Sequence, residues 1–452
     1  MILPKPVDEA YGAVNPEQPL TGGNNDPRYV NCAAARGSEN EARLIARRIQ
    51  RSEPPHYSKQ LFTGHRGCGK TTELFRLKRI LEDEYHFFVV YFDVETELDV
   101  SDLDYPDVLL AIAQQVDKQL RETAHIELHP KLLENVARWF GTTIITEQQS
   151  HNVEETLKTQ YGLGVKTPAR FFADILVAFK GEIKNSSQRR TEIRRELERN
   201  ATQLLQRVNE LVDNAQVCLK QILRRGLVLI IDGLEKLLYR VMSDGGPSSH
   251  DMLFIDHGEQ LRAPHCHVIL TVPINLLFNK NVGQIFPDYT ILPMVKITEE
   301  HGRPCEIGRQ ALRDVVARRV DVGAIFDNLA LVDELVMASG GHVRDLLRLV
   351  RYTFDYTSDT VSAEHVQQAK RKLVNEYDYL MQPDDLPRLH EVHSTRQVPS
   401  DEPHALLLHN LLVLEYRNGG RWADVHPAVQ ATRKFQESKP KPRRPTRARG
   451  RK

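Results

Sequence analysis

The chain has 452 residues, 40% of them hydrophobic, and no net charge, which is enough material for two or three globular domains. It contains no run of about 18 apolar residues, which excludes an ordinary membrane-spanning helix, and its first residues lack the apolar stretch of a secretory signal. Five scattered cysteines without a Cys-x-x-Cys pair predict a reducing, cytoplasmic location rather than a disulfide framework.

The first strong pattern lies between residues 60 and 81. Residues 60–63 predict the end of an apolar strand, and residues 72–81 have helical spacing. The loop between them matches the phosphate-binding P-loop pattern G-x-x-x-x-G-K-T. Its members are Gly64, His65, Arg66, Gly67, Cys68, Gly69, Lys70, Thr71 and Thr72. Backbone N–H groups of such a loop, and the N-terminus of the helix that follows, surround bound phosphates.

The residue types at the end of this loop predict ATP and Mg²⁺ as cofactors. Lys70 would reach the β- and γ-phosphates, and the Thr71 hydroxyl would hold Mg²⁺. A chance match of a glycine-rich loop is the alternative, but strand, loop and helix follow in the required order.

A second buried strand is predicted over residues 87–94 and a helix over 108–120. Residues 120–225 then predict a helical insertion. Its second half carries apolar residues spaced alternately three and four apart, a heptad seam that must be buried against something. The seam is Leu197, Ala201, Leu204, Val208, Leu211, Ala215, Cys218 and Ile222. Basic residues precede it at Arg189, Arg190, Arg194 and Arg195; they indicate either a solvated face or an anionic partner.

The run Leu227–Asp232 is a continuous apolar strand that ends in an acid. Further strands over residues 268–272 and 290–294 predict a parallel α/β sheet. The carboxyl ends of its strands would place Asp232 beside the glycine-rich loop, where it would support Mg²⁺. Thr271 ends the next strand, so it would either orient water near the γ-phosphate or be an ordinary strand residue. The sequence His265-Cys266-His267 precedes that strand, and its alternating faces argue against a metal site.

A helical region follows the sheet. Residues 331–338 have helical spacing, and a new helix starts after a double glycine with Arg344 in its first turn. The pattern Gly340-Gly341-x-x-Arg344-x-Leu-Leu resembles the sensor-2 helix in the lid of AAA+ ATPases of the origin-recognition and initiator type. That resemblance implies that Arg344 reaches the γ-phosphate; a surface arginine is the alternative.

The chain departs from AAA+ enzymes after Asp232, where they usually carry a catalytic glutamate. Here Gly233 follows, and Asp232-Gly233-Leu234-Glu235 is similar to the D-G-x-D/E pattern of NACHT and related STAND ATPases, which are regulated signalling switches. This resemblance, over roughly residues 30–355, implies that Glu235 orients the attacking water. No arginine lies in residues 274–289, where AAA+ enzymes often keep a trans-acting arginine, so ring-type hydrolysis between subunits is not supported, although a homo-oligomer stays open.

The last predicted elements are a helix that leads into a strand over residues 405–416, a turn at 417–420 and a strand over 421–425. Helix plus hairpin resembles the end of a winged-helix domain, which initiator-type ATPases carry after the lid. Residues 401–409, at the recognition-helix position, are acidic and apolar rather than base-reading, so a protein contact or packing against the ATPase core fits better.

The C-terminal residues 433–452 contain ten Lys or Arg and one Glu, a net charge of +9. Such a segment cannot form a core and is expected to be disordered. It would bind nucleic acid through phosphates without sequence readout, or serve only as a solubilising terminus.

The predicted fold is therefore α/β, a P-loop NTPase with a parallel sheet, helical insertion, helical lid and C-terminal winged-helix-like domain. The predicted segments are an N-terminal extension 1–29, the ATPase domain 30–300, the lid 301–375, the winged-helix-like domain 376–432 and the basic tail 433–452.

The favoured function is a cytoplasmic, MgATP-binding regulatory or defence-type switch with slow ATP hydrolysis and an unidentified effector protein as partner. Its catalytic or sensing residues would be Glu235, Thr271 and Arg344, with Thr71 and Asp232 at the metal. Two alternatives stay open, a DNA-linked ATPase of the initiator or transposition-helper kind and a nucleotide-binding scaffold that does not turn over.

Overall fold

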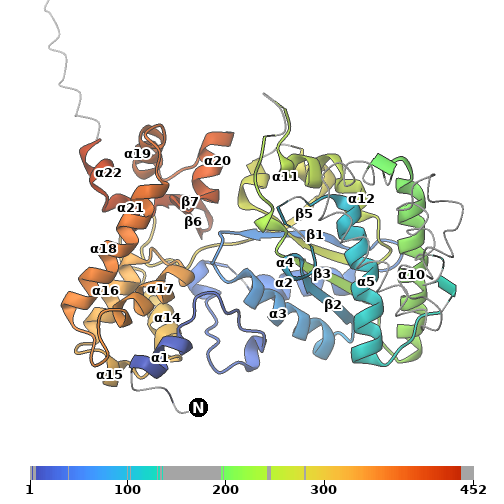
Figure 1. The fold of residues 1–452 in the computed structure, drawn as a ribbon, viewed down its shortest axis with the longest axis horizontal. Coiled ribbons are helices and arrows are strands. Elements are labelled where there is room, and N and C mark those ends of the chain that lie inside the picture. The colour runs from blue at the N-terminus through green and yellow to red at the C-terminus, as the bar shows by residue number, and fades with distance from the viewer. Residues whose placement is uncertain are drawn as a thin grey trace, which may run out of the picture.

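The computed structural model describes residues 7–38, 40–98, 103–129, 198–241, 246–278 and 281–438, together with a few isolated positions between them. It is a mixed α/β fold in which a sheet with helices on both faces packs beside a mainly helical region (Figure 1). Several predictions lie outside the described residues, namely most of the first half of the insertion, Arg189, Arg190, Arg194, Leu197 and the tail beyond residue 438.

The larger region is built on five parallel strands in the order β2-β3-β4-β1-β5. Their continuous apolar runs suit a sheet that is covered on both faces. The strands are β1 (Lys59–Gly64), β2 (Phe88–Asp93), β3 (Leu227–Asp232), β4 (His267–Thr271) and β5 (Asp288–Leu292). Each strand lies close to its predicted position, which confirms the parallel α/β sheet.

Helices cover the two faces of this sheet because alternate strand residues point in opposite directions. On one face, Val228 and Ile230 share a hydrophobic cluster with α2 (Glu41–Arg51) and α3 (Lys70–Arg79). On the other face, Leu229 and Ile231 pack with α5 (Tyr105–Ala124) and α10 (Ala201–Gln221). The sheet is therefore the middle of three layers.

Helix α10 shows how the predicted seam is buried. It packs against α5, and four seam residues are fully buried, Leu204, Val208, Leu211 and Ala215. At the C-terminal end Leu219 is buried instead of Cys218, and Ile222 is 46% exposed. The buried stripe drifts because a straight helix has 3.6 residues per turn rather than 3.5. This helix, which lies inside the predicted insertion 120–225, belongs to the layer that covers the sheet.

The second region has a hydrophobic core of its own. Its helices are α14 (Glu306–Ala317), α16 (Ala330–Ala338), α17 (Val343–Phe354), α18 (Ala363–Leu380), α19 (Asp385–Thr395) and α20 (Glu402–His409). A hairpin of β6 (Val413–Asn418) and β7 (Gly420–Val425) and the short helices α21 (Pro427–Gln430) and α22 (Arg433–Glu437) complete it. The predicted boundary between residues 375 and 376 falls inside α18, and both sides of it contribute to the same core.

Both ends of the described chain join this core. The N-terminal helix α1 (Val7–Ala13) buries Val7 and Ala10 in it. At the other end Phe435 in α22 is only 2% exposed and stacks on His390. The prediction of disorder from residue 433 is therefore wrong for residues 433–437, because an aromatic side chain anchors them.

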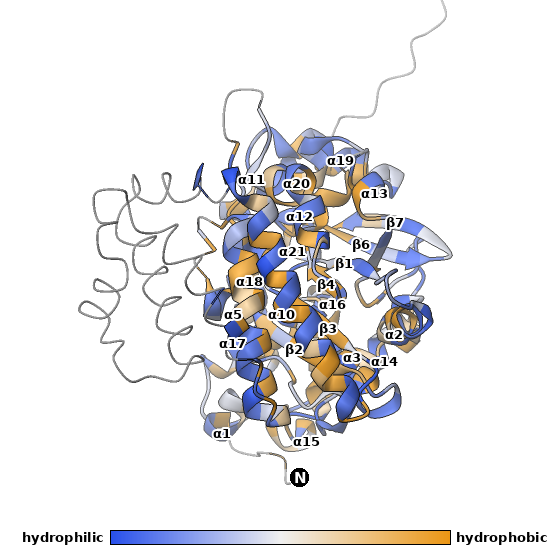
Figure 2. Ribbon diagram, turned by 90° about the vertical axis from the view of Figure 1, so that its right-hand side faces the viewer, coloured by the Kyte–Doolittle hydropathy of each residue, from blue (hydrophilic) through white to orange (hydrophobic). Residues whose placement is uncertain are grey.

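The two regions meet along α20 and the hairpin. Helix α20 packs against the 3-10 helix η7 (Ile274–Phe278), and Tyr416 and Trp422 of the hairpin join the cluster around α2 and α3. Figure 2 shows that the helices carry hydrophobic residues on some faces and hydrophilic residues on others. Within the described residues, none of the helices has the length and apolar character needed to cross a membrane.

Candidate functional site

The loop between β1 and α3, residues 64–69, is called the glycine-rich loop below. Its three glycines have φ angles of 151°, 84° and 103° at Gly64, Gly67 and Gly69, a region that side chains disfavour. A Cβ at Gly67 would lie 2.7 Å from both the Arg344 Cβ and the His342 Nε2. Glycine is needed there because the N-terminus of α17 approaches the loop backbone.

Lys70 lies at the start of α3 and is almost completely buried. Its Nζ donates to the carbonyl oxygens of Gly64 (3.1 Å) and His65 (3.2 Å), and it lies 3.1 Å from Glu235 Oε1. Burial lowers the pKa of this ammonium, but the carboxylates of Glu235 and Asp232 outweigh burial and leave the pKa raised. Lys70 is therefore charged and held close to the loop.

Asp232 ends β3 and is 1% exposed. Its Oδ2 accepts a hydrogen bond from the Tyr91 hydroxyl (2.9 Å), and its Oδ1 accepts one from the Gly233 N–H (2.9 Å). The Thr71 hydroxyl also donates to it. Burial and the nearby Glu235 raise the pKa of Asp232 to about 6. Thr71 and Asp232, the two residues predicted to hold a metal, thus lie side by side.

Glu235 sits in a tight 3-10 turn, η5 (Leu234–Lys236), that follows β3. Gly233 has a φ of 85°, and a Cβ there would lie 2.5 Å from Asp93 Oδ1, so a glutamate at that position would clash. Burial raises the pKa of Glu235, but Lys70, helped by the Thr271 hydroxyl, outweighs burial and lowers it. Strand β4 lies between β1 and β3, which brings Thr271 to this place.

Arg344 is in the first turn of α17, as predicted. Its backbone N–H donates to the Gly67 carbonyl (3.3 Å), and its Nη2 lies 3.2 Å from Glu17 Oε2. The side chain is 24% exposed, and its Nε is buried without a hydrogen-bond partner among the described residues. The helix therefore presents Arg344 beside the glycine-rich loop rather than on a distant surface.

A cavity of about 470 Å³ joins these residues. It is lined by Arg66–Glu73, Glu235 and Arg344 and by the N-terminal residues 16–20, 28–30 and 32. Its volume lies within the range of about 300–1,000 Å³ that small-molecule sites occupy. Most of the predicted site residues thus line one cavity, whereas Asp232 and Thr271 are buried and do not line it.

His65 is the exception among the loop residues. Its ring points into the C-terminal region, where Nδ1 donates to the Leu408 carbonyl (3.1 Å) and Nε2 accepts from the Glu415 N–H (2.8 Å). Burial lowers the pKa of His65 to about 3, which keeps the ring neutral. Only its backbone is placed to contact a ligand.

Sequence reasoning missed several residues around the cavity. Arg36 donates to the Cys68 carbonyl (2.7 Å) and so supports the loop, and the Tyr29 hydroxyl donates to Glu73 (3.0 Å). Asp93 ends β2 directly opposite Asp232 and lies 3.3 Å from Lys236. Asp93 could have been found, because Phe88–Asp93 is a second apolar strand that ends in an acid. Arg36 and Tyr29 carry no such signal.

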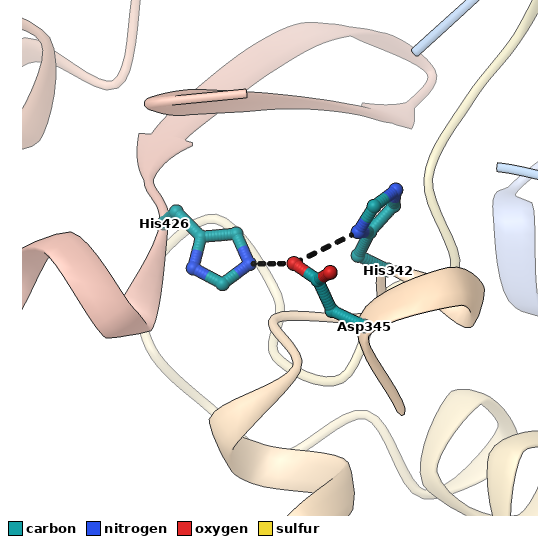
Figure 3. A group of neighbouring side chains, drawn as sticks. All are labelled: His342, Asp345 and His426. Atoms are coloured by element: carbon teal, nitrogen blue, oxygen red, sulfur yellow. Dashed lines mark ion pairs between the residues drawn. The ribbon is translucent and has the colours of Figure 1, made fainter. Parts of the chain in front are cut away.

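One cluster has the distances of a metal site within the described part of the chain: His342, Asp345 and His426 offer ligand atoms within 4.8 Å of one another (Figure 3). Other groups also bond to the cluster, although the His342 Nδ1 (3.1 Å) and the His426 Nε2 (3.3 Å) lie near Asp345 Oδ2 without making a hydrogen bond. Tyr377 donates to Asp345 (2.7 Å), and the His426 Nδ1 accepts from the Ala428 N–H (3.0 Å). The proton of neutral His426 is therefore on Nε2, the atom that faces Asp345, and that atom has no lone pair for a metal.

The two histidines that flank Cys266, His265 and His267, have separate side-chain partners. His265 lies 3.0 Å from Asp213, with half of its side chain exposed. His267 instead accepts from the Ser58 N–H through Nδ1 (3.1 Å). The two imidazole rings therefore contact different neighbouring residues.

A scan against protein-family models found no match for this chain, and a search of curated proteins found no significant match either. What the site does must therefore be inferred from its own residues and their geometry.

Proposed function

We propose that the chain is a MgATP-binding ATPase of the P-loop class that acts as a nucleotide-dependent regulatory switch. The observation that carries the proposal is that Lys70, Thr71, Glu235 and Arg344 line one cavity at the carboxyl edge of the sheet, with Asp232 bonded to Thr71. A charged lysine, a hydroxyl with a carboxylate, and an arginine are the groups that a nucleoside triphosphate and its magnesium ion need.

The glycine-rich loop would bind the phosphates through its backbone N–H groups and the N-terminus of α3. The Lys70 ammonium, which lies 3.1 Å from Glu235 Oε1, would leave that carboxylate and pair with a phosphate instead. Thr71 and Asp232 would hold Mg²⁺, with Asp93 nearby, and the ion would neutralise charge on the phosphate oxygens.

Glu235 is the residue best placed to take a proton from water. Its Oε1 faces Lys70, while Oε2 is buried without a hydrogen-bond partner among the described residues. Once Lys70 has moved to a phosphate, both oxygens are free to orient water, with the Thr271 hydroxyl beside them. Arg344 would stabilise charge on the γ-phosphate from the other side.

Two ion pairs favour a slow enzyme, which suits a switch. Lys70 is paired with Glu235 and Arg344 with Glu17, so each cation must leave a carboxylate before it serves a phosphate. The DNA-linked alternative finds no support in α20, because His404, Ala405, Leu407 and Leu408 of that helix are buried. Its exposed first residue, Glu402, is acidic and would be repelled by the phosphates of DNA.

Calorimetry with ATP and Mg²⁺ tests the binding claim. Lys70→Ala should weaken ATP binding by roughly tenfold or more, about 1.4 kcal/mol, because a cation that faces the phosphates is lost. Lys372→Ala, which removes a lysine paired with Asp355 outside the cavity, is the control and should bind normally. Equal ATP affinity of Lys70→Ala and wild type would refute the proposal.

Steady-state phosphate release tests turnover. Glu235→Gln should retain ATP binding but release phosphate more slowly by about 10² to 10⁴. No release by the wild type would instead favour the non-hydrolysing scaffold. The remaining alternative, the DNA-linked ATPase, is tested by measuring DNA binding at two salt concentrations with a chain that ends at residue 438. Salt-resistant binding by that chain would favour the DNA-linked ATPase.

A further inference from the structure

Tyr91, in the edge strand β2, is held at its backbone and at its ring. The Gln119 amide, on α5, accepts from the Tyr91 N–H (3.3 Å) and donates to the Tyr91 carbonyl (2.8 Å). This side chain takes the place of a further strand, because β2 is at the edge of the sheet and an edge strand has backbone groups without a strand to pair with. The ring contacts Phe75 on α3, with 4.4 Å between the ring centroids. Helices on both faces of the sheet thus fix this residue.

The hydroxyl of Tyr91 reaches the residues that the proposed function assigns to the metal. Tyr91 lies opposite Ile230 in the parallel register of β2 and β3, and Asp232 is two residues farther along β3, on the same face of the sheet. The hydroxyl donates to Asp232 Oδ2 at 2.9 Å. Tyr91 does not line the cavity, so any effect that it has on a ligand must pass through Asp232.

Three donors surround the Asp232 carboxylate. Tyr91 donates to Oδ2 and the Gly233 N–H donates to Oδ1, and the Thr71 hydroxyl donates to the same carboxylate. Because Tyr91 and Gly233 hold different oxygens, together they resist rotation of the carboxylate about its Cβ–Cγ bond. The carboxylate therefore presents a fixed acceptor to Thr71.

The orientation of the Thr71 hydroxyl depends on that acceptor. A hydroxyl has one proton and two lone pairs, and a proton that is directed to Asp232 leaves the lone pairs for another group. Thr71 lines the cavity, whereas Asp232 does not. The hold on Asp232 thus decides which way the Thr71 oxygen presents its lone pairs at the cavity wall.

We propose that Tyr91 is a positioning residue of the metal site: its hydroxyl fixes the Asp232 carboxylate so that the Thr71 hydroxyl donates to it and turns its lone pairs toward Mg²⁺. This role rests on the proposed function, in which Thr71 and Asp232 hold the ion. A hydroxyl that only satisfied a buried carboxylate would act on folding alone, and its loss would change ATP binding equally with and without Mg²⁺. Magnesium dependence therefore separates positioning from plain structural support.

Calorimetry with ATP in excess Mg²⁺ and in EDTA measures this dependence. The dissociation constant in EDTA divided by that in Mg²⁺ is called the magnesium gain below. Tyr91→Phe keeps the ring beside Phe75 but loses the donor, and it should lower the magnesium gain about tenfold, the effect of one hydrogen bond to a charged group. Its ATP affinity in EDTA should equal that of the wild type. Tyr352→Phe is the matched control, because Tyr352 donates to Glu376 at 2.7 Å outside the cavity; its magnesium gain should be unchanged.

A second variant tests the path through Thr71. Thr71→Val removes the hydroxyl at nearly constant volume, so it should lower the magnesium gain as well. Adding Tyr91→Phe to Thr71→Val should lower the gain no further, because Tyr91 acts through that hydroxyl. The inference is overturned by a double variant whose loss is the product of the two single losses. An unchanged gain in Tyr91→Phe, or an equal loss of ATP affinity in Mg²⁺ and in EDTA, also overturns it.

Urea unfolding without nucleotide tests the bond between Tyr91 and Asp232 by itself. Tyr91→Phe should lower the urea midpoint of the wild type but not that of Asp232→Ala, which has no carboxylate to accept from the hydroxyl. Equal shifts in both backgrounds would overturn the inference even if ATP binds.

The calorimetry also separates this inference from the proposed function. A wild type that binds ATP with a magnesium gain that Tyr91→Phe shares refutes the positioning role alone. A wild type that binds no ATP in either solution refutes the proposed function, and the role of Tyr91 with it.

Discussion

The buried ion pair between Lys70 and Glu235 gives the sharpest prediction. Their side chains are 3% and 9% exposed and 3.1 Å apart. Coulomb's law gives about 5 kcal/mol at this distance for an effective dielectric constant near 20, and removing one partner of a buried pair typically costs about 3–5 kcal/mol because the other charge is stranded. Lys70→Met and Glu235→Gln should each lower the free energy of unfolding by that amount.

The double variant should cost much less than the sum of the two single variants, because it leaves no stranded charge. We expect a coupling energy of about 3 kcal/mol, measured by urea unfolding without nucleotide. The exposed pair Arg43–Glu84, 2.9 Å apart and over 40% exposed at both side chains, is the control and should show a coupling below about 1 kcal/mol. If the double variant lowers the free energy of unfolding by the sum of the two single variants, within about 0.5 kcal/mol, the stabilising buried pair is refuted.

The pH dependence of this pair follows from the lowered pKa of Glu235. A carboxyl whose pKa is lower in the folded than in the unfolded state stabilises the fold above its ordinary pKa. That contribution is lost as pH falls through the lowered value. The difference in stability between wild type and Glu235→Gln should therefore shrink in acid.

Three further predictions concern other parts of the molecule. The pKa of Asp232 is raised from 3.8 to about 6, so its ionisation should reduce stability by about 3 kcal/mol as pH rises through that window; Asp232→Asn should lack this slope in unfolding measurements without Mg²⁺. Gly67→Ala should abolish tight ATP binding in calorimetry, whereas Gly283→Ala, where a Cβ meets nothing within 4 Å, should not. A chain that ends at residue 438 should melt like the full chain, whereas one that ends at 432 loses Phe435 and about 3–5 kcal/mol.

The sheet and the centre of the site could be predicted because they depend on local patterns. Apolar runs specify buried parallel strands, and the carboxyl ends of such strands must meet at one edge. Lys70, Asp232 and Thr271 therefore come together in the structure as the sequence indicates. The same reasoning would have added Asp93, which ends β2 opposite Asp232.

The contacts on the N-terminal side of the cavity could not be predicted in this way. Glu17 and Tyr29 come from irregular N-terminal segments, and Glu17 meets Arg344 across more than three hundred residues of sequence. No periodicity marks such a partner. The predicted boundary between residues 375 and 376 lies inside α18, because a change in sequence motif does not interrupt the hydrophobic stripe of one helix.

The residues at the variable positions of the P-loop pattern make specific contacts in this chain. The pattern requires glycines, lysine and threonine, but the ring of His65 and the carbonyl of Arg66 make the contacts to Leu408, Glu415 and His342. A loop that shifts on binding phosphates must therefore change contacts with the hairpin and with α17. If the chain binds ATP as proposed, reciprocal coupling between two sites means that a partner that moves the hairpin would change ATP affinity by the same factor by which ATP changes the affinity for that partner.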